Sequence, residues 1–330
     1  MKGLAELNTT NVTVIGTILI DCKGFSETVY RPKAKNLGSV RFVHGGVGRN
    51  VAENLARLGM RVSMISSVNQ DGNGKAVVEH LNECGVNTEY VMPVPEKGMG
   101  FWLAVLDEEG NLVGSISDMP DLTSLARMIE QKGEEIVRAA THIVLVLDLN
   151  EQLTKQVLRL AQEQNKPVFG LPSNFGVIEA HPEVLDGLDC FVCNEIEAAK
   201  LFDSGPFVKL EREEQFRRMK TYVNQRSIRR MVITLGSEGA VYFDASSGEA
   251  SFYPASSVQL VDSSGAGDAF FSGTVLGLVN GKELAEAVAI GTRLAAWTIE
   301  DPESCCPTLG ERAAEDAFVR DVIRQNLQGI

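Results

Sequence analysis

The sequence has few basic residues for its size. Its 330 residues include 31 Lys and Arg against 44 Asp and Glu, which gives a formal net charge of −13 with His neutral. A surface with this balance repels phosphate backbones and anionic lipid headgroups. The composition therefore argues against a nucleic-acid polymer or a membrane surface as partner, and an anionic substrate would need a local feature that overcomes the field.

Long apolar runs and abundant cysteines are also missing. The apolar stretches without a charged residue are short, at 12–20, 139–147 and 269–281, and none reaches the ~18 residues of a membrane span. The N-terminus shows no apolar core of a secretion signal. Six cysteines are too few for a disulfide framework, and Cys190 and Cys193, three apart on an expected strand, point to opposite faces rather than to one metal. We expect a reduced, cytoplasmic protein.

Strand-like and helix-like segments alternate along most of the chain. Short runs rich in apolar and β-branched residues predict strands, and segments with apolar residues at helical spacing predict helices between them. This alternation is typical of an α/β fold with a mainly parallel central sheet flanked by helices. The predicted strands are 12–20, 61–68, 142–147, 167–171, 189–192 and 230–235, and the predicted helices are 49–58, 74–84, 151–164, 211–225, 267–279, 283–299 and 311–325.

Two segments interrupt this alternation. Residues 19–43 show little helical periodicity, and 98–118 contains two β-rich runs around a turn sequence at 108–111, which favours a hairpin. We expect the two segments to form a small β-sheet lid over a single core, so that residues 1–330 make up one domain.

The strongest chemical signal is the sequence Asp-Ser-Ser-Gly-Ala-Gly-Asp at 262–268. A strand predicted at 257–261 precedes it and a helix follows, so Gly265, Ala266 and Gly267 would form an anion hole at the positive end of the helix dipole. Asp268 would lie beside the anion as a general base. This combination can transfer a phosphoryl group to a hydroxyl. A glycine turn followed by an aspartate also occurs without function, and spacing alone does not decide between the two interpretations.

A second glycine cluster at 45–48 also precedes a predicted helix. Asn50, in the first turn of that helix, offers a donor and an acceptor to neighbouring sugar hydroxyls. Arg49 either reaches a substrate or pairs with a surface acid. The cluster does not match a dinucleotide fingerprint, because Val51 stands where the third glycine is needed, and the chain has no P-loop sequence. Nicotinamide-dependent hydride transfer and P-loop chemistry are therefore disfavoured.

Together, the sequences at 45–59 and 262–268 resemble the two signatures of the PfkB family of ribokinase-like carbohydrate kinases, and the resemblance covers nearly the whole chain. It implies a ribokinase-like α/β fold with a β lid, and a phosphotransferase that uses ATP and Mg²⁺ on a small-molecule sugar or nucleoside. It also implies roles for further residues. Those associated with ATP and Mg²⁺ are Asn194, Glu197, Thr234, Gly236 and Gly239, and those that bind the acceptor are Asp21, Gly45, Gly46, Asn50 and Asp118.

The resemblance leaves the acceptor open. The sequences at 45–50 and 116–119 are most similar to pseudouridine kinases, so phosphorylation of pseudouridine to pseudouridine 5′-phosphate is the leading hypothesis. Ribokinase, adenosine kinase and fructokinase-like activities are alternatives, and so, from another class, is a non-catalytic ligand sensor on the same fold. Many relatives also bind K⁺, for which Asp262 and Ser264 are the candidates together with 300–304. Some dimerise through their lids, so a homodimer is a further hypothesis.

Overall fold

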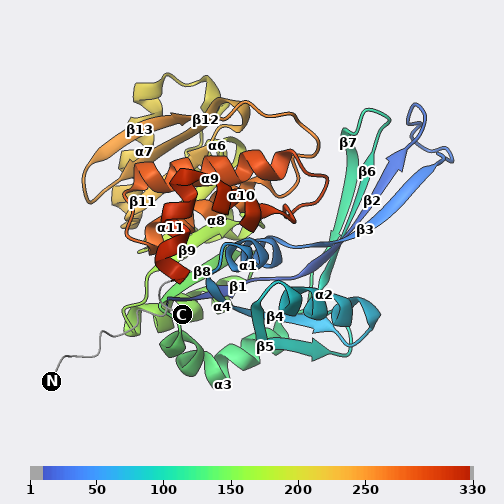
Figure 1. Cartoon of the computed structure of the whole chain (residues 1–330), viewed down its shortest axis with the longest axis horizontal. Coiled ribbons are helices and arrows are strands. Elements are labelled where there is room, and N and C mark those ends of the chain that lie inside the picture. Colours follow the sequence, from blue (N-terminus) through green and yellow to red (C-terminus); the bar gives the residue numbers. More distant parts are fainter. Residues whose placement is uncertain (1–9, 328–330) are drawn as a thin grey trace.

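A nine-stranded sheet runs through the body of the molecule (Figure 1). The computed structural model describes residues 10–327. The strand order is β13-β12-β11-β10-β9-β8-β1-β4-β5, and every neighbouring pair is parallel except β11–β12 and β12–β13. The strands are β1 (Asn11–Ile15), β4 (Arg61–Asn69), β5 (Val86–Val94), β8 (His142–Leu147), β9 (Val168–Pro172), β10 (Cys190–Asn194), β11 (Arg230–Thr234), β12 (Gly239–Asp244) and β13 (Glu249–Pro254).

Helices cover both faces of this sheet. Strands such as β1 and β8 are almost completely buried, because their apolar side chains point to both faces and each face needs a cover. One face packs against α1 (Val47–Arg57), α2 (Gly72–Glu83), α8 (Ala266–Val279), α9 (Leu284–Ile299), α10 (Leu309–Glu315) and α11 (Ala317–Leu327). The other packs against α3 (Thr123–Ala139), α4 (Glu151–Glu163), α5 (Phe175–Ala180), α6 (Glu195–Leu201) and α7 (Arg212–Arg226). The predicted α/β class is confirmed.

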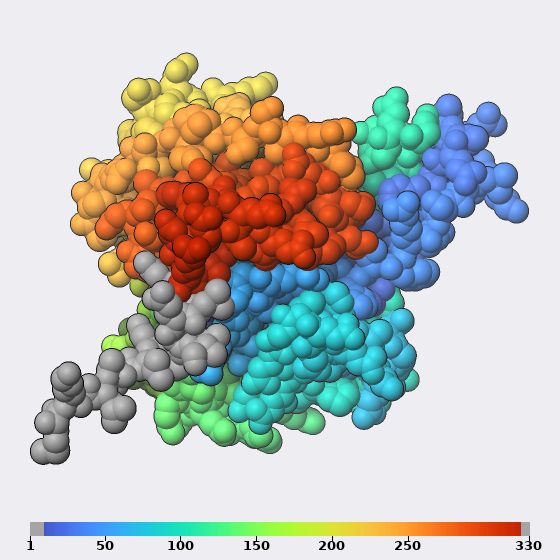
Figure 2. Space-filling view, in the orientation of Figure 1, coloured from blue at the N-terminus to red at the C-terminus, as the bar shows by residue number. Residues whose placement is uncertain are grey.

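A second sheet of four strands stands out from the body (Figures 1 and 2). Its order is β3-β2-β6-β7, and the two antiparallel hairpins are joined by parallel pairing of β2 with β6. We call this sheet the lid. Its strands are β2 (Leu19–Ser26), β3 (Gly38–Gly45), β6 (Gly100–Leu106) and β7 (Leu112–Asp118). They coincide closely with the two irregular segments of the sequence, whereas closure of the lid over a site stays a prediction.

Three predicted elements differ from the structure. The run 12–20 is not one strand, because the chain leaves the core sheet after Ile15 and enters the lid at Leu19. The segment 257–261 is not a strand: it is mostly exposed, and strand propensity without a neighbouring strand to pair with does not make a ladder. The helix predicted at 311–325 is interrupted at Asp316, whose backbone is extended and whose Oδ1 accepts the N–H of Phe318 at 2.9 Å, which starts a second helix.

Other elements were not anticipated, namely α3, α5, α6, β5 and the β12–β13 hairpin at the sheet edge. The expectation for Cys190 and Cys193 is confirmed, because their side chains belong to the apolar cores on opposite faces of the sheet. No helix within residues 10–327 is long and apolar enough to span a bilayer.

Candidate active site

The turn before α8 is built around Gly265. Its φ of 77° lies in the left-handed region, and a Cβ atom at this position would be 1.9 Å from the backbone oxygen of Ser304. Glycine is required here by its own backbone conformation and by close packing against the following loop. Ile299, the last residue of α9 before this loop, also fixes the turn, because its backbone oxygen accepts the N–H groups of Val261 and Asp262.

The first N–H groups of α8 differ in their surroundings. The N–H of Ala266 donates to Ser263 O at 3.3 Å, whereas those of Gly267 and Asp268 have no acceptor among the described residues. Gly267 is exposed, and a Cβ built on it would meet nothing within 4 Å. Open space over unpaired N–H groups at a helix N-terminus is where an anion binds. The predicted anion hole therefore has its open edge at Gly267 and Asp268 rather than at Ala266.

Asp268 and Asn50 are in direct contact. The Oδ2 atom of Asp268 accepts a hydrogen bond from Asn50 Nδ2 at 2.6 Å, across 218 residues of sequence. Burial raises the pKa of Asp268 to about 6, and the hydrogen bond from Asn50 and the charge of Arg49 only partly oppose this. Behind Asn50, the thiol of Cys305 lies 3.6 Å from its backbone oxygen. The two glycine motifs thus meet through the two polar side chains that the sequence singled out.

Asp21 and the first glycine cluster adjoin this contact. Gly45 faces Leu19 across the β2–β3 ladder, and a Cβ atom on it would lie 2.1 Å from Asp21 Oδ1. Gly46, with φ of 94°, caps α1 and accepts the N–H of Asn50 at 2.9 Å. Burial raises the pKa of Asp21. The structure therefore places Asp21, Gly45, Gly46 and Asn50 next to one another where the lid joins the body.

Asp118 does not join this group. It is the last residue of β7, its side chain is 65% exposed, and its ion pair is with Lys97 at 3.9 Å. Its partners within the described chain are Lys97 and, across the strand pair, Phe101, and not Asp21, Asn50 or Asp268.

Asn194 and Glu197 form a capping box at the start of α6. Asn194 Oδ1 accepts the N–H of Glu197 at 2.9 Å, and Glu197 Oε2 accepts the N–H of Asn194 at 2.9 Å. Burial raises the pKa of Glu197 to about 7. Asn194 is also the register partner of Thr234, since β10 and β11 are parallel and end together. The turn that follows contains Gly236 and Gly239, both with positive φ, and a Cβ on Gly239 would be 2.1 Å from Tyr253 O.

Sequence reasoning missed a lysine from the lid. Lys23, in β2, is 6% exposed, and its Nζ lies 3.0 Å from Ser264 Oγ and 3.4 Å from Asp262 Oδ2. The other carboxylate oxygen of Asp262 accepts the N–H of Ser264 at 2.8 Å. Burial would raise the pKa of Asp262, but the Ser264 hydrogen bonds and the ammonium of Lys23 outweigh it and lower the pKa. The only sequence signal was a lysine inside a β-rich segment, which is ordinary in an exposed strand.

Arg49 pairs with an acid, although this acid is buried rather than on the surface. Its guanidinium lies 2.6 Å from Glu53 Oε2 one turn later in α1, and both side chains are almost inaccessible. Glu53 also contacts Arg57 and His80. Burial alone would raise the pKa of Glu53, but the hydrogen bond of His80 and the charges of Arg49 and Arg57 lower it to about 2. Arg49 is thus a buried side chain that is paired within its own helix.

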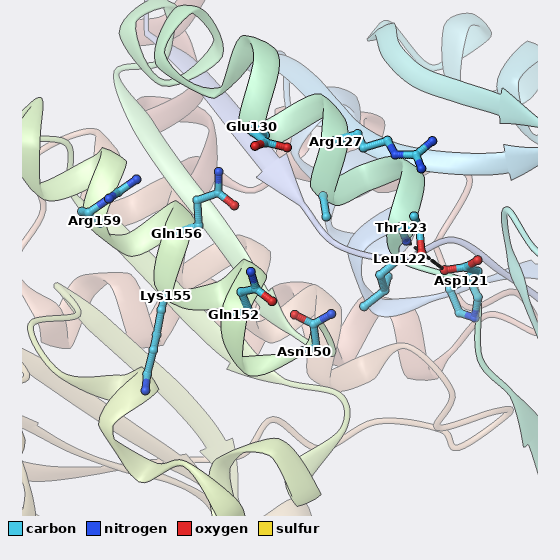
Figure 3. A pocket seen from close by; sticks show the side chains of 12 residues that line it. Asp121, Leu122, Thr123, Arg127, Glu130, Asn150, Gln152, Lys155, Gln156 and Arg159 are labelled. Carbon is cyan, nitrogen blue, oxygen red and sulfur yellow. Dashed lines mark hydrogen bonds between the residues drawn. The ribbon is translucent and has the colours of Figure 1, made fainter.

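A groove and a smaller cavity lie beyond this cluster. Figure 3 shows a groove between α3 and α4, lined by polar side chains such as Arg127, Gln152 and Arg159; none of the predicted site residues lines it. A smaller cavity is lined by residues that include Thr17, Met119, Asp148 and Asn174. It adjoins the first glycine cluster, because a Cβ on Gly46 would be 2.9 Å from Thr17 O.

Asp148 is the buried carboxylate of this cavity. Its Oδ2 accepts hydrogen bonds from the N–H of Thr17 at 3.1 Å and from the Thr17 hydroxyl, whereas Oδ1 has no partner among the described residues. Burial raises the pKa of Asp148 to about 6, against the effect of the Thr17 hydrogen bonds.

The nine-stranded sheet with its flanking helices and the four-stranded lid define the fold as ribokinase-like. Two solved structures share the fold. Ribokinase from Giardia lamblia superposes with a TM-score of 0.79 at 17% identity, covering 93% of this chain and 99% of that one. Ribokinase from Arabidopsis thaliana, in complex with ribose and ATP, superposes with a TM-score of 0.76 at 20% identity, covering 96% and 99%.

Sequence comparison places the chain more narrowly. The model of the pfkB family carbohydrate kinases matches residues 9–309, and the chain belongs to this family. It is 34% identical over 293 residues to guanosine-inosine kinase of Exiguobacterium acetylicum, covering 89% of this chain and 95% of that protein. It is 31% identical over 278 residues to pseudouridine kinase of Escherichia coli (strain K12), covering 84% and 86%. The protein is therefore a phosphotransferase of the sugar and nucleoside kinase type.

Proposed function

We propose that this kinase transfers the γ-phosphoryl group of ATP to the 5′-hydroxyl of a nucleoside, with pseudouridine as the leading acceptor. The observation that carries the proposal is the 2.6 Å contact between Asn50 and Asp268. It brings a side chain suited to ribose hydroxyls against a carboxylate that stands at an open helix N-terminus. The three groups needed for transfer to a sugar hydroxyl are thereby adjacent.

Asp268 acts as the general base in this proposal. A base works best when its pKa lies near the working pH, so that it is ionised yet still accepts a proton readily. The pKa of about 6 meets this condition at neutral pH. Asn50 donates to Oδ2 and leaves Oδ1 for the proton of the attacking hydroxyl.

The N–H groups at the start of α8 stabilise the transferring phosphoryl group. The N–H groups of Gly267 and Asp268 have no acceptor within the described chain, and the space beside Gly267 is open. Backbone donors held by the helix need no reorganisation when charge develops on the phosphoryl oxygens. They also bind an anion without adding a basic side chain, which fits a protein whose net charge is −13.

ATP and Mg²⁺ are assigned to the ends of β10 and β11. Asn194 and Thr234 are register partners there, and Gly236 in the turn that follows has open space beside it, which would let a nucleotide approach the backbone. The capping box uses Asn194 Oδ1 and Glu197 Oε2, so the second carboxylate oxygen of Glu197 is the donor that suits Mg²⁺, which would neutralise phosphate charge when bound. Glu197, with its pKa raised to about 7, gains its full negative charge most readily beside a cation.

A nucleoside fits the acceptor side better than a free sugar does. Asp21, Gly45, Gly46 and Asn50 supply groups for the ribose, and the cavity of Thr17 and Asp148 adjoins them. The unpartnered Oδ1 of Asp148 is an acceptor for an N–H group of a base. Asp118 lies apart from this set in the structure and would join it only through a movement of the lid. A purine nucleoside is the second candidate, since the guanosine-inosine kinase matches nearly the whole chain.

A panel of ATP-coupled assays tests the proposal. ADP formation is measured with pseudouridine, uridine, guanosine, inosine, adenosine, ribose and fructose, and product is identified by mass. We expect kcat/KM to be highest for one of the nucleosides and to be at least tenfold lower for ribose. Ribose lacks the base and its contacts, and a tenfold difference corresponds to about 1.4 kcal/mol of binding free energy. Turnover of ribose or fructose alone would refute a nucleoside acceptor, and tight nucleoside binding without ADP formation would favour a sensor.

A homodimer through the lid also stays a proposal. The lid has exposed apolar side chains on β3, β6 and β7, which are Val40, Phe42, Leu103, Leu112, Val113 and Ile116. Phe101 and Trp102, on β6 of the lid, are only partly exposed.

A further inference from the structure

A buried ammonium group lies where a monovalent metal ion was expected. Lys23 Nζ contacts Ser264 Oγ at 3.0 Å and Asp262 Oδ2 at 3.4 Å, and the lysine side chain is only 8% exposed. A lysine is rarely buried unless it is paired, because the charge loses its hydration. The two oxygens named as K⁺ candidates therefore both have a cation beside them already.

The remaining groups of the Asp262 loop leave little for a second cation. Asp262 Oδ1 accepts the N–H of Ser264 at 2.8 Å, so Oδ2 is the oxygen that would bind a metal ion. That oxygen faces Lys23. Two unit positive charges within about 4 Å repel strongly in a half-buried site. The side chains present therefore do not fit K⁺ while Lys23 stays in place.

We propose that Lys23 is a tethered replacement for the monovalent cation of the Asp262–Asp268 loop, and that this kinase works without K⁺. Lys23 is a positioning residue: it neutralises Asp262 and holds Ser264, and thereby holds the turn that presents the N–H groups of Gly267 and Asp268. Because the ammonium group is attached to β2, it stays beside Asp262 whatever salt is in solution. The activity part of this inference rests on the proposed kinase function, whereas the stability part does not.

The sharpest test replaces Lys23 in the full chain and compares salts. Wild type, Lys23→Met and Lys23→Arg are unfolded thermally without substrates in KCl, NaCl and tetramethylammonium chloride at equal ionic strength. We expect the Tm of wild type and Lys23→Arg to be the same in all three salts. Lys23→Met should have a lower Tm in tetramethylammonium and recover part of it selectively in KCl, because removal of the ammonium opens Asp262 and Ser264 to K⁺.

The kinase assay adds a second readout. Loss of one charge-assisted hydrogen bond corresponds to about a 10- to 100-fold effect, so kcat/KM of Lys23→Met should fall by this factor in tetramethylammonium and rise again in KCl. Wild-type activity should change less than twofold between the salts. If no acceptor is phosphorylated, the proposed function fails while the Tm comparison still decides the role of Lys23.

Controls keep the outcome decisive. Lys220→Met, at an exposed position of α7, should show no K⁺ selectivity. Lys23→Gln retains a donor to Ser264 without the charge, so it replaces Lys23→Met if that variant does not fold. A selective rise of the wild-type Tm or activity in KCl would overturn the proposal, because K⁺ would then bind beside Lys23. Absence of K⁺ selectivity in the neutral variants would overturn it equally.

Discussion

Helices α1 and α8 begin in the same way and are used in opposite ways. Each follows a glycine with positive φ, Gly46 at 94° and Gly265 at 77°. The first turn of α1 is buried, from Gly48 through Asn50, whereas Gly267 in the first turn of α8 is exposed with open space above it. A glycine turn before a helix therefore does not make an anion site by itself; the space around the N–H groups decides.

The charges of the two helix starts are opposite as well. A cation near a helix N-terminus is unfavourable, and α1 carries Arg49 there, compensated by Glu53 within the same helix. In α8 the first turn carries Asp268, whose only described side-chain partner is the neutral amide of Asn50. Arg49 and Glu53 thus form a buried ion pair that supports the fold, whereas the Asp268 carboxylate has no charged partner among its described contacts.

Replacement of Asp268 should have the largest effect. In Asp268→Asn the amide still accepts from Asn50 but no longer takes a proton, so kcat should fall by ~10²–10⁴-fold. Steady-state kinetics with the best acceptor measures this. A kcat within a few-fold of wild type would remove Asp268 from the role of base.

Stability supplies the control for that variant. The pKa of Asp268 is raised from the usual 3.8 to about 6 in the folded protein. The contribution of this carboxyl to the free energy of unfolding therefore falls as the pH rises from 3.8 through 6. Asp268→Asn should therefore unfold at no lower temperature than wild type above pH 6, so that its inactivity cannot come from unfolding.

Glu53→Gln should have the next largest effect, on the free energy of unfolding instead of on chemistry. It leaves the buried guanidinium of Arg49 without its counter-charge, which typically costs about 3–5 kcal/mol. Urea denaturation at pH 7 measures the loss, and Glu134→Gln, which removes an exposed ion pair of α3 with Arg138, should change stability by less than ~1 kcal/mol.

The pH dependence of Glu53 runs opposite to that of Asp268. Its folded pKa of about 2 lies below the usual 4.5, so its stabilisation is complete above pH 4.5 and is lost as the pH falls towards 2. The stability gap between wild type and Glu53→Gln should shrink in that interval. A gap independent of pH would contradict the ion-pair explanation.

A pair of glycine substitutions in one turn should separate a glycine that the backbone requires from one that keeps space open. Gly265→Ala combines a positive φ with a Cβ near Ser304 O and should cost at least about 1–3 kcal/mol. Gly267→Ala points into open space within a helix and should change stability by no more than ~1 kcal/mol. Thermal unfolding measures both.

Gly267→Ala, the variant that keeps its stability, should still lose activity. A methyl group at Gly267 obstructs the approach of phosphate to N–H groups that are still present, so kcat/KM for ATP should fall about 10- to 100-fold, less than for a lost donor. Full activity of Gly267→Ala would mean that the anion binds elsewhere.

The sequence predicted those parts of the site that are encoded locally. Gly265, Asp268 and Asn50 each stand at a fixed offset from a helix start, so a short pattern is enough to find them. The contact between Asn50 and Asp268 was not visible, because it depends on how α1 and α8 pack. Lys23 was missed for the same reason: nothing in its neighbourhood along the chain shows that β2 delivers it to Asp262.

The fold was predictable to a similar extent. Strand β8 and helix α4 followed closely from apolar periodicity, because their burial repeats along the chain. The segment 257–261 looked like a strand and is an exposed connection, since its apolar residues Leu260 and Val261 have no sheet edge to pair with. Elements that depend on a distant partner were the ones that local patterns could not define.

Strand β2 couples the positions of two polar side chains. Asp21 and Lys23 are two positions apart, so both project from the same face of one strand. Asp21 lies against Gly45, and Lys23 contacts Ser264 in the turn before α8. Because both side chains belong to one strand, a movement of the lid that displaces one of them displaces the other by a comparable amount. In the proposed kinase, acceptor binding at Asp21 and ordering of the turn at Ser264 would therefore depend on the same movement of β2.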